Sequence, residues 1–147
     1  MDETSFGVAI PFVQHLGFKL VLFDGGASQI DYDPAPEHLN SFSVTHGGAL
    51  MTLLDVTMAT AARSVDLETG VVTIEMKTSF MQPSRGMLQA HGSVMHRTGS
   101  MAFCEATIKD SRGRTTAHAS GTFKYVPRTP IGPKGADGKS TTVISTD

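Results

Sequence analysis

The chain has 147 residues, of which 39% are hydrophobic, and this is enough for one globular domain with a substantial core. Its formal net charge of −2, without a basic stripe, argues against a nucleic-acid partner. The acidic residues 1–5 do not resemble a secretory signal, no run reaches the roughly 18 apolar residues of a membrane span, and the single Cys104 cannot form an internal disulfide. We expect a soluble cytoplasmic protein with no membrane partner.

The first forty residues predict a short helix and a β-hairpin. Residues 4–16 have a loose helical spacing of apolar side chains, and Pro11 should shorten or break that helix. Residues 18–23 and 27–32 are typical of strands and are joined by an Asp-Gly-Gly turn. A polar loop containing Asn40 then leads to the central segment.

Residues 45–64 are the segment around which the rest of the chain is organised. Beyond Gly47-Gly48 they predict a helix of four to five turns, about 25 Å long. Apolar side chains surround this helix, and a helix that is apolar all round is expected to be buried. Asp55 nevertheless stands in its middle, and a buried carboxylate costs several kcal/mol unless it is paired or kept for chemistry.

The start and the middle of this helix together form a candidate site. Gly47 and Gly48 are expected to leave first-turn N–H groups open to a ligand, at the positive end of the helix dipole. A structural interpretation is open for each residue. The glycines permit close packing, His46 is suited to capping the helix, and Asp55 is suited to a structural hydrogen bond.

Four strand-like runs follow, at residues 72–80, 87–96, 100–109 and 115–125. The first alternates with period two, and its predicted buried face carries Val72, Ile74, Met76, Thr78 and Phe80. Small residues recur on one face of the last two runs, which would let a helix approach closely: Ala102, Cys104, Ala106, Ala117, Ala119 and Gly121. The prediction is an α+β fold with a long curved antiparallel sheet wrapped around one central buried helix.

The chain is expected to end in a tail. Residues 127–147 are rich in Pro, Gly, Ser and Thr and carry few core-forming side chains, so their composition predicts flexibility. We therefore predict a globular domain over residues 1–126 and a C-terminal tail over residues 127–147.

The motif in the central segment resembles that of a known family. Asn40 followed by His46-Gly47-Gly48, then Asp55, then the 72–76 strand and Phe80-Met81-Gln82-Pro83, is similar to the PaaI-type hotdog-fold acyl-CoA thioesterases. The resemblance extends from about residue 18 to residue 125. It implies a hotdog fold and hydrolysis of acyl-CoA thioesters at a site shared by two subunits.

The resemblance also implies roles for individual residues. The Gly47 amide would polarise the thioester carbonyl, and Asn40 would assist there or hold a water. Asp55 of the partner chain would act as general base or as nucleophile, with a pKa raised by its apolar surroundings. Thr73 would orient the water, and His46 would shape the loop rather than accept the proton.

The substrate-binding candidates are Gly48, Met51, Met58, Arg85, Arg97 and Gly99. The two methionines share a helix face with Asp55 and would suit an acyl pocket, although filling gaps in a core is their commoner role. The two arginines lie in glycine-containing turns, where they would meet the phosphates of coenzyme A or remain solvated.

We expect no metal, because the histidines lack ligand spacing, and no cofactor, since coenzyme A is part of the substrate. The expected assembly is a homo-oligomer, with a dimer as the minimum and a tetramer favoured. Two alternatives remain. One is a hotdog hydratase or dehydratase acting on acyl thioesters, and the other is a non-catalytic acyl-CoA binding module.

Overall fold

The computed structural model describes residues 6–131 and 141–144. Its elements, in chain order, are α1 (Pro11–Leu16), β1 (Lys19–Asp24), β2 (Ala27–Tyr32), the 3-10 helix η1 (Pro36–His38), α2 (Gly47–Arg63), β3 (Thr69–Phe80), β4 (Leu88–Arg97), β5 (Met101–Lys109), β6 (Thr115–Ile131) and β7 (Thr141–Ile144). The short first helix, the hairpin, the central helix and the four later strands were all predicted from the sequence.

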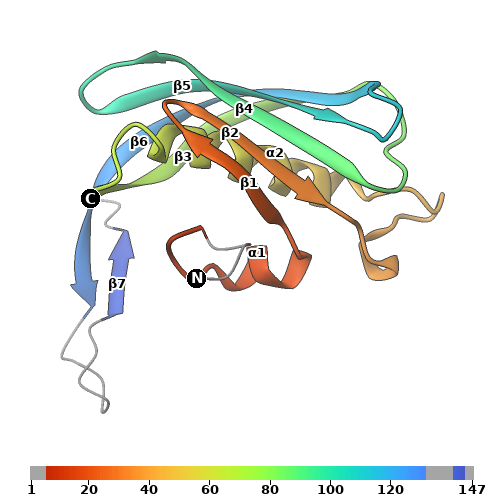
Figure 1. Ribbon diagram of the computed structural model, residues 1–147, viewed down its shortest axis with the longest axis horizontal. Coiled ribbons are helices and arrows are strands. Elements are labelled where there is room, and N and C mark those ends of the chain that lie inside the picture. Colours follow the sequence, from red (N-terminus) through yellow and green to blue (C-terminus); the bar gives the residue numbers. More distant parts are fainter. Residues whose placement is uncertain (1–5, 132–140, 145–147) are drawn as a thin grey trace.

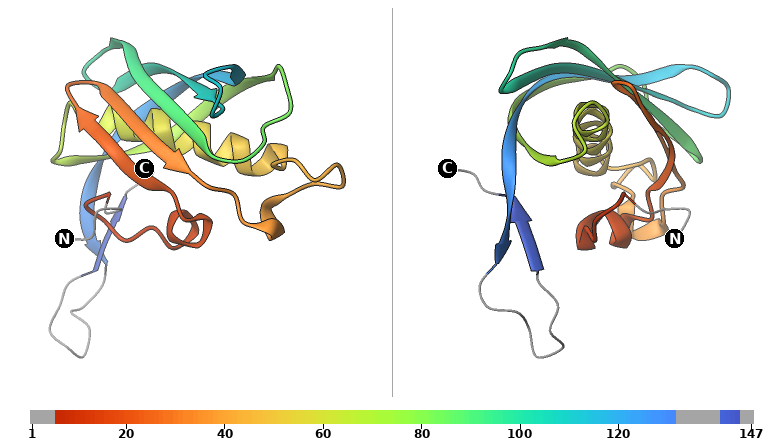
Figure 2. Two further views of the ribbon diagram at one scale, coloured as in Figure 1. Left: turned by 45° about the vertical axis from the view of Figure 1, so that its right-hand side comes forward. Right: turned by 60° about the vertical axis from the view of Figure 1, so that its left-hand side comes forward.

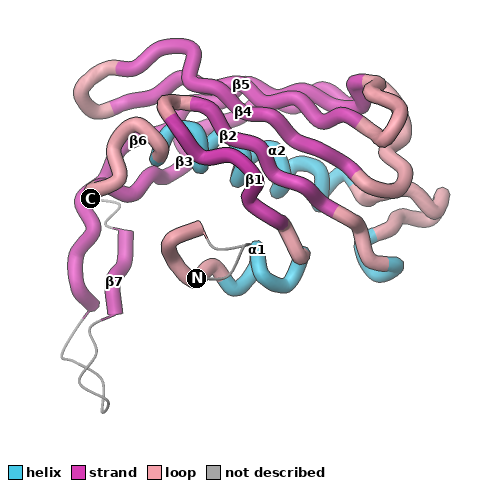
Figure 3. Tube along the Cα trace, viewed as in Figure 1, coloured by secondary structure: helices cyan, strands magenta, loops and turns pink. Residues whose placement is uncertain are grey.

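The strands form an antiparallel sheet in the order β1-β2-β4-β5-β6-β3, and β7 pairs with the far end of β6. This sheet curves around α2, as the view along the helix shows (Figures 1 and 2). The predicted α+β hotdog architecture is therefore confirmed. Figure 3 shows the one long helix beneath a curved layer of strands.

Proline sets the start of α1 instead of breaking it. Pro11 occupies the first turn, where its missing N–H costs nothing, and Gly17 ends the helix with a φ of 74°. Val13 and Leu16 are buried, so this short helix contributes to the core. It lies on the side of α2 that the curved sheet leaves open (Figure 2).

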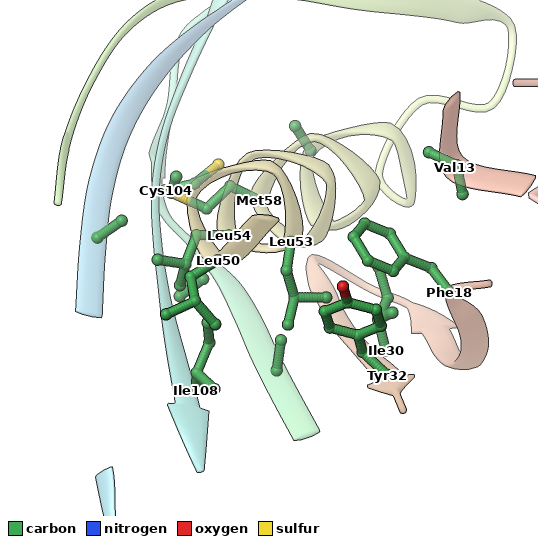
Figure 4. Packing of buried hydrophobic residues seen from close by; sticks show 14 of the residues in the cluster. Val13, Phe18, Ile30, Tyr32, Leu50, Leu53, Leu54, Met58, Cys104 and Ile108 are labelled. Carbon is green, nitrogen blue, oxygen red and sulfur yellow. The ribbon is translucent and has the colours of Figure 1, made fainter. Parts of the chain in front are cut away.

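The core lies between α2 and the concave face of the sheet (Figure 4). Leu53, Leu54 and Met58 are fully buried there. The small residues predicted on β5 and β6 face this helix and are all buried: Ala102, Cys104, Ala106, Ala117, Ala119 and Gly121. Their small size allows the helix to pack tightly against these strands.

Gly92 in β4 marks a close approach of the helix to the sheet. A Cβ atom at this position would lie 2.7 Å from the carbonyl oxygen of Thr57 and 2.6 Å from Oγ of Ser28. That oxygen of Thr57 already accepts a hydrogen bond of 2.6 Å from the Ser28 hydroxyl. Only glycine therefore fits between the helix backbone and β2.

The helix is not buried all round, and this prediction was wrong. Met51 is 40% exposed, and Asp55 on the same face is half-buried. The sheet and α1 cover most of the circumference but leave this stripe open. Most of the helix surface thus packs in the core, whereas the open stripe is accessible to a ligand or a second chain.

A β-bulge in β3 overturns the predicted face assignment of that strand. Thr73 pairs with Phe123 and Glu75 pairs with Thr122, so Ile74 is an extra residue and the alternation shifts by one. Before the bulge, Val71 is buried and Thr73 contacts the helix, whereas Ile74 is 52% exposed. The prediction of a buried Ile74 was wrong because a bulge leaves no periodic signal.

The end of the chain contains strand structure that its composition did not predict. β6 continues to Ile131 without a break at residue 126, and residues 128–131 pair with β7. Within the predicted tail, residues 127–131 and 141–144 thus have strand structure. The remainder of the predicted tail, residues 132–140 and 145–147, lies outside the described residues.

No helix among the described residues is long and apolar enough to span a membrane.

Candidate active site

The first turn of α2 leaves one backbone amide open. His46 is the N-cap, and its Nδ1 atom accepts a 2.8 Å hydrogen bond from the Gly48 N–H. The amides of Ala49 and Leu50 both donate to the His46 carbonyl, at 3.0 and 3.1 Å. The Gly47 N–H donates to no group in the part of the chain that the structure describes. We predicted that the amides of Gly47 and Gly48 would both be open. The Gly48 amide is not, because the His46 side chain accepts its hydrogen bond.

A cleft of about 540 Å³ lies in front of Gly47. It is lined by Asn40, Phe42, Val44, Thr45, Gly47, Leu50, Phe80, Met81, Gln82, Pro83, Ser84 and Arg85. Most of this lining is apolar, and Phe42 is 80% exposed within it. From the sequence, Phe80, Met81 and Pro83 were named only as parts of a predicted strand or of the family motif. The other apolar lining residues were not identified, because each one alone resembles an ordinary core or loop residue.

Asn40 holds the loop that delivers the start of α2. Its Oδ1 atom accepts hydrogen bonds from the amides of Phe42 and Val44, at 2.9 and 3.3 Å. Ser43 within this loop has a φ of 60°, an uncommon conformation for a residue other than glycine. The side-chain nitrogen of Asn40 has no partner among the described residues. Asn40 lines the same cleft as Gly47.

Asp55 forms the second part of the site, on the open stripe of α2. Thr73 Oγ1 donates a 2.6 Å hydrogen bond to Asp55 Oδ1 across the gap between the helix and β3. Loss of water on burial raises the pKa of Asp55 above its ordinary value, and the Thr73 hydrogen bond partly opposes this shift. A carboxylate with a raised pKa is a stronger base than one in water.

A shallow depression of about 250 Å³ surrounds this carboxylate, lined by Met51, Thr52, Asp55, Thr73 and Met76. Met51 therefore lies beside Asp55, as its helical spacing predicted. Met58 does not, because it is fully buried and its methyl group lies 3.2 Å from where a Cβ of Gly121 would stand. Met58 is a core residue that no substrate can reach in this conformation.

The two candidate phosphate-binding arginines lie at opposite ends of the molecule. Arg85 lines the cleft of Gly47. Arg97 is at the other end of the sheet, where its guanidinium lies 3.5 Å from the Asp66 carboxylate and 4.7 Å from the ring centre of Tyr125. Gly99 is exposed in the adjoining β4–β5 turn. The Arg97 guanidinium is thus already in contact with two side chains of its own chain.

Within residues 6–131 and 141–144, no three His, Cys, Asp or Glu side chains gather in a way that could hold a metal ion.

A backbone donor before an apolar cleft and a partly desolvated acid on the same helix are the elements of an acyl-transfer site. The family model described as the thioesterase superfamily matches residues 42–117, which include both elements. The chain belongs to the thioesterase superfamily.

Individual relatives agree with this assignment. A Saccharolobus solfataricus protein whose name describes it as a candidate esterase is 28% identical over 130 residues, covering 88% of this chain and 92% of the relative. A conserved Pseudomonas aeruginosa protein of known structure is 26% identical with a TM-score of 0.77, covering 80% of this chain and 95% of the other.

The structure of the Escherichia coli PaaI protein from the phenylacetic acid degradation operon is also similar in fold. Its TM-score is 0.74 at 22% identity, with 78% of this chain and 83% of the other covered. The predicted resemblance to PaaI-type hotdog thioesterases is confirmed.

Proposed function

We propose that the protein hydrolyses acyl-CoA thioesters to a free acid and coenzyme A, at sites that two copies of the chain share. The observation that carries this proposal is the separation of two complementary groups on α2. Asp55 follows Gly47 by eight residues, which is about 12 Å along a helix axis. That distance is too long for both groups of one chain to act on the same carbonyl carbon.

The first part of the proposed site acts on the carbonyl oxygen. The Gly47 N–H, at the positive end of the α2 dipole, donates to this oxygen as negative charge develops on it. Asn40 lines the same cleft and is suited to donate to the carbonyl or to hold the attacking water. Removing one such donor typically lowers kcat by about 10²–10³-fold.

The second part supplies the base or the nucleophile. As a base, the Asp55 carboxylate of the partner chain takes a proton from water, and the water oxygen bonds to the carbonyl carbon. The tetrahedral intermediate then collapses, the carbon–sulfur bond breaks, and the thiolate takes the proton from Asp55. As a nucleophile, the carboxylate itself attacks the carbonyl carbon, and the thiolate leaves as the carbon–sulfur bond breaks. Water then hydrolyses the resulting anhydride to the free acid and the Asp55 carboxylate. Thr73 holds the reacting carboxylate in either case.

The edge strand β3 supports the shared arrangement. It pairs only with β6 in the described sheet, so one edge of its twelve residues is free. Ile74 and Phe80 on this strand are each 52% exposed. Antiparallel pairing of two β3 strands would remove this edge and set the start of one α2 opposite the middle of the other. We propose a dimer as the smallest active unit, with a tetramer formed from two dimers.

Free-thiol release from a panel of acyl-CoA thioesters tests the proposed activity, with wild type measured beside Asp55→Asn. We expect turnover by wild type, without any added metal or cofactor, and its loss in the variant. A 3-hydroxyacyl thioester is included in the panel. Loss of water from it without thiol release would indicate the dehydratase, and binding of acyl-CoA without either reaction would indicate the binding module.

A further inference from the structure

A second cleft, of about 410 Å³, lies at the same end of the sheet as the start of α2. It is lined by Arg85, Asp110, Ser111, Arg112 and Arg114. These residues come from two turns, the β3–β4 turn and the β5–β6 turn, which Figure 1 shows near the beginning of the helix. We refer to this feature as the arginine cleft.

The arginine cleft carries a net positive charge in a chain whose net charge is −2. Asp110 is matched by Arg114, whose Nε atom donates to it at 2.9 Å, and the amides of Arg112 and Arg114 also donate to this carboxylate. Burial alone would raise the pKa of Asp110, but these hydrogen bonds outweigh burial and lower it. The guanidinium groups of Arg85 and Arg112 have no ion-pair partner among the described residues.

The arginine cleft adjoins the cleft of Gly47, because Arg85 lines both. The preceding residue fixes this junction. Ser84 is 1% exposed, its carbonyl accepts from the Thr45 amide at 3.0 Å, and its hydroxyl donates to Thr116 Oγ1 at 2.7 Å. The backbone at Arg85 is thus tied to the loop before α2 and to the start of β6. The open amide and the arginines therefore border two neighbouring clefts that share one side chain.

We propose that the arginine cleft binds the phosphate groups of coenzyme A, with Arg112 and Arg85 as the principal contacts. This inference rests on the proposed thioesterase function and deepens it by identifying where the carrier end of the substrate lies. Guanidinium groups form paired, charge-assisted hydrogen bonds with phosphate oxygens. Arg97, which the sequence also suggested as a phosphate contact, is not part of this cleft. It contacts Asp66 and Tyr125 at the far end of the sheet.

The first test compares substrates with and without phosphates. Wild type, Arg112→Gln and Lys19→Gln are assayed on one acyl group carried by coenzyme A or by N-acetylcysteamine, which has no phosphate. Lys19→Gln removes the same charge from the distant strand β1. We expect Arg112→Gln to raise KM for the acyl-CoA by about five- to tenfold with kcat unchanged. This increase in KM should be smaller at high salt, because salt screens the charges. The N-acetylcysteamine ester should be hydrolysed equally by all three proteins.

The second test does not require turnover. Calorimetric titration with adenosine 3′,5′-bisphosphate, and separately with inorganic phosphate, should show that the nucleotide binds wild type and Lys19→Gln several-fold more tightly than Arg112→Gln. Binding that depends on Arg112 without any thioester hydrolysis would support the arginine cleft and refute the proposed function. Two results would refute the arginine cleft and leave the proposed function standing. One is that Arg112→Gln slows hydrolysis of both thioesters by the same factor. The other is that the nucleotide affinity falls only in Arg97→Gln.

Discussion

The start and the middle of α2 provide opposite chemistry. At the start, a backbone amide donates into a wide, mostly apolar cleft of about 540 Å³. In the middle, a side-chain carboxylate held by Thr73 lies in a depression of about 250 Å³, where it is proposed to act as base or nucleophile. Asp55 of the same chain is about 12 Å along the helix from the first group. The second group has no free backbone donor beside it, because the amides of the helix interior are hydrogen-bonded along the helix. Each half therefore supplies what the other lacks.

The largest expected effect comes from the carboxylate half. Asp55→Asn is nearly the same size but can act neither as a base nor as an anionic nucleophile. We expect kcat to fall by about 10²-fold or more in thiol-release assays. Asp24→Asn, at the exposed end of β1, is the matched control and should retain activity. Full activity in Asp55→Asn would show that this acid is structural.

The same substitution should stabilise the protein at neutral pH. A folded-state pKa above the unfolded value means that the Asp55 contribution to stability is present at low pH and is lost as pH rises through the folded-state pKa. Asparagine never becomes charged and avoids this loss. Thermal unfolding should give a Tm a few degrees higher for Asp55→Asn at pH 7, with little difference at pH 3, where both side chains are neutral. An equal Tm difference at both pH values would contradict the raised pKa.

The donor half can be tested by removing the N–H hydrogen of Gly47. Gly47 is the first helical residue, where proline is well tolerated, and His46 before it already has an extended ψ of 138°. Gly47→Pro removes the open N–H, and we expect kcat to fall by about 10²-fold. Gly47→Ala keeps the N–H, and its Cβ would meet Phe80 at an ordinary 3.5 Å. Equal activity of the two variants, both folded by circular dichroism, would rule out the amide as the donor.

A smaller effect is expected from Thr73. Thr73→Val removes the hydrogen bond that favours the charged carboxylate, so the pKa of Asp55 should rise further. The acidic limb of the kcat/KM profile should then move to higher pH, with less than about tenfold loss at the plateau. Thr122→Val is the matched control, because it removes a similar 2.6 Å bond to Glu75, outside the site. A limb that stays in place, or moves to lower pH, would contradict this role.

The smallest effect on activity is expected from the helix cap. His46→Ala removes the acceptor for the Gly48 amide, and loss of an N-cap costs about 1 kcal/mol of stability. His46→Asn supplies another good N-cap acceptor and should restore most of the loss in Tm. If His46 instead carried a proton during the reaction, both variants would lose activity equally and the basic or acidic limb of the pH profile would disappear.

Most of the fold was predictable because its signals are periodic. The alternation in β4 to β6, the glycine turns and the apolar central helix all leave patterns in the sequence, and the small residues facing α2 were identified by their spacing. The bulge at Ile74 is different, since an extra residue destroys the period on which the prediction depends. The bulge is also what turns Thr73 toward Asp55.

The site was predictable in its chemical groups and less so in their surroundings. Asp55 and the glycines at the start of α2 stood out because a charge inside an apolar helix and paired glycines at a helix start are unusual. That His46 would bind the Gly48 amide, or that Met58 would be fully buried, depends on side-chain directions that spacing does not specify. The arginine cleft joins two turns distant in sequence, so only the fold reveals it.

The most direct measurement of the central claim is complementation between the two inactive variants. Asp55→Asn and Gly47→Pro chains are purified, mixed, and allowed to exchange subunits before thiol release is measured. In a shared site, each hybrid dimer joins an intact Gly47 amide to an intact Asp55, and random exchange should restore about one quarter of wild-type activity. Hybrids that form, as shown by mass spectrometry, yet stay inactive would mean that each chain carries a complete site, which contradicts the account.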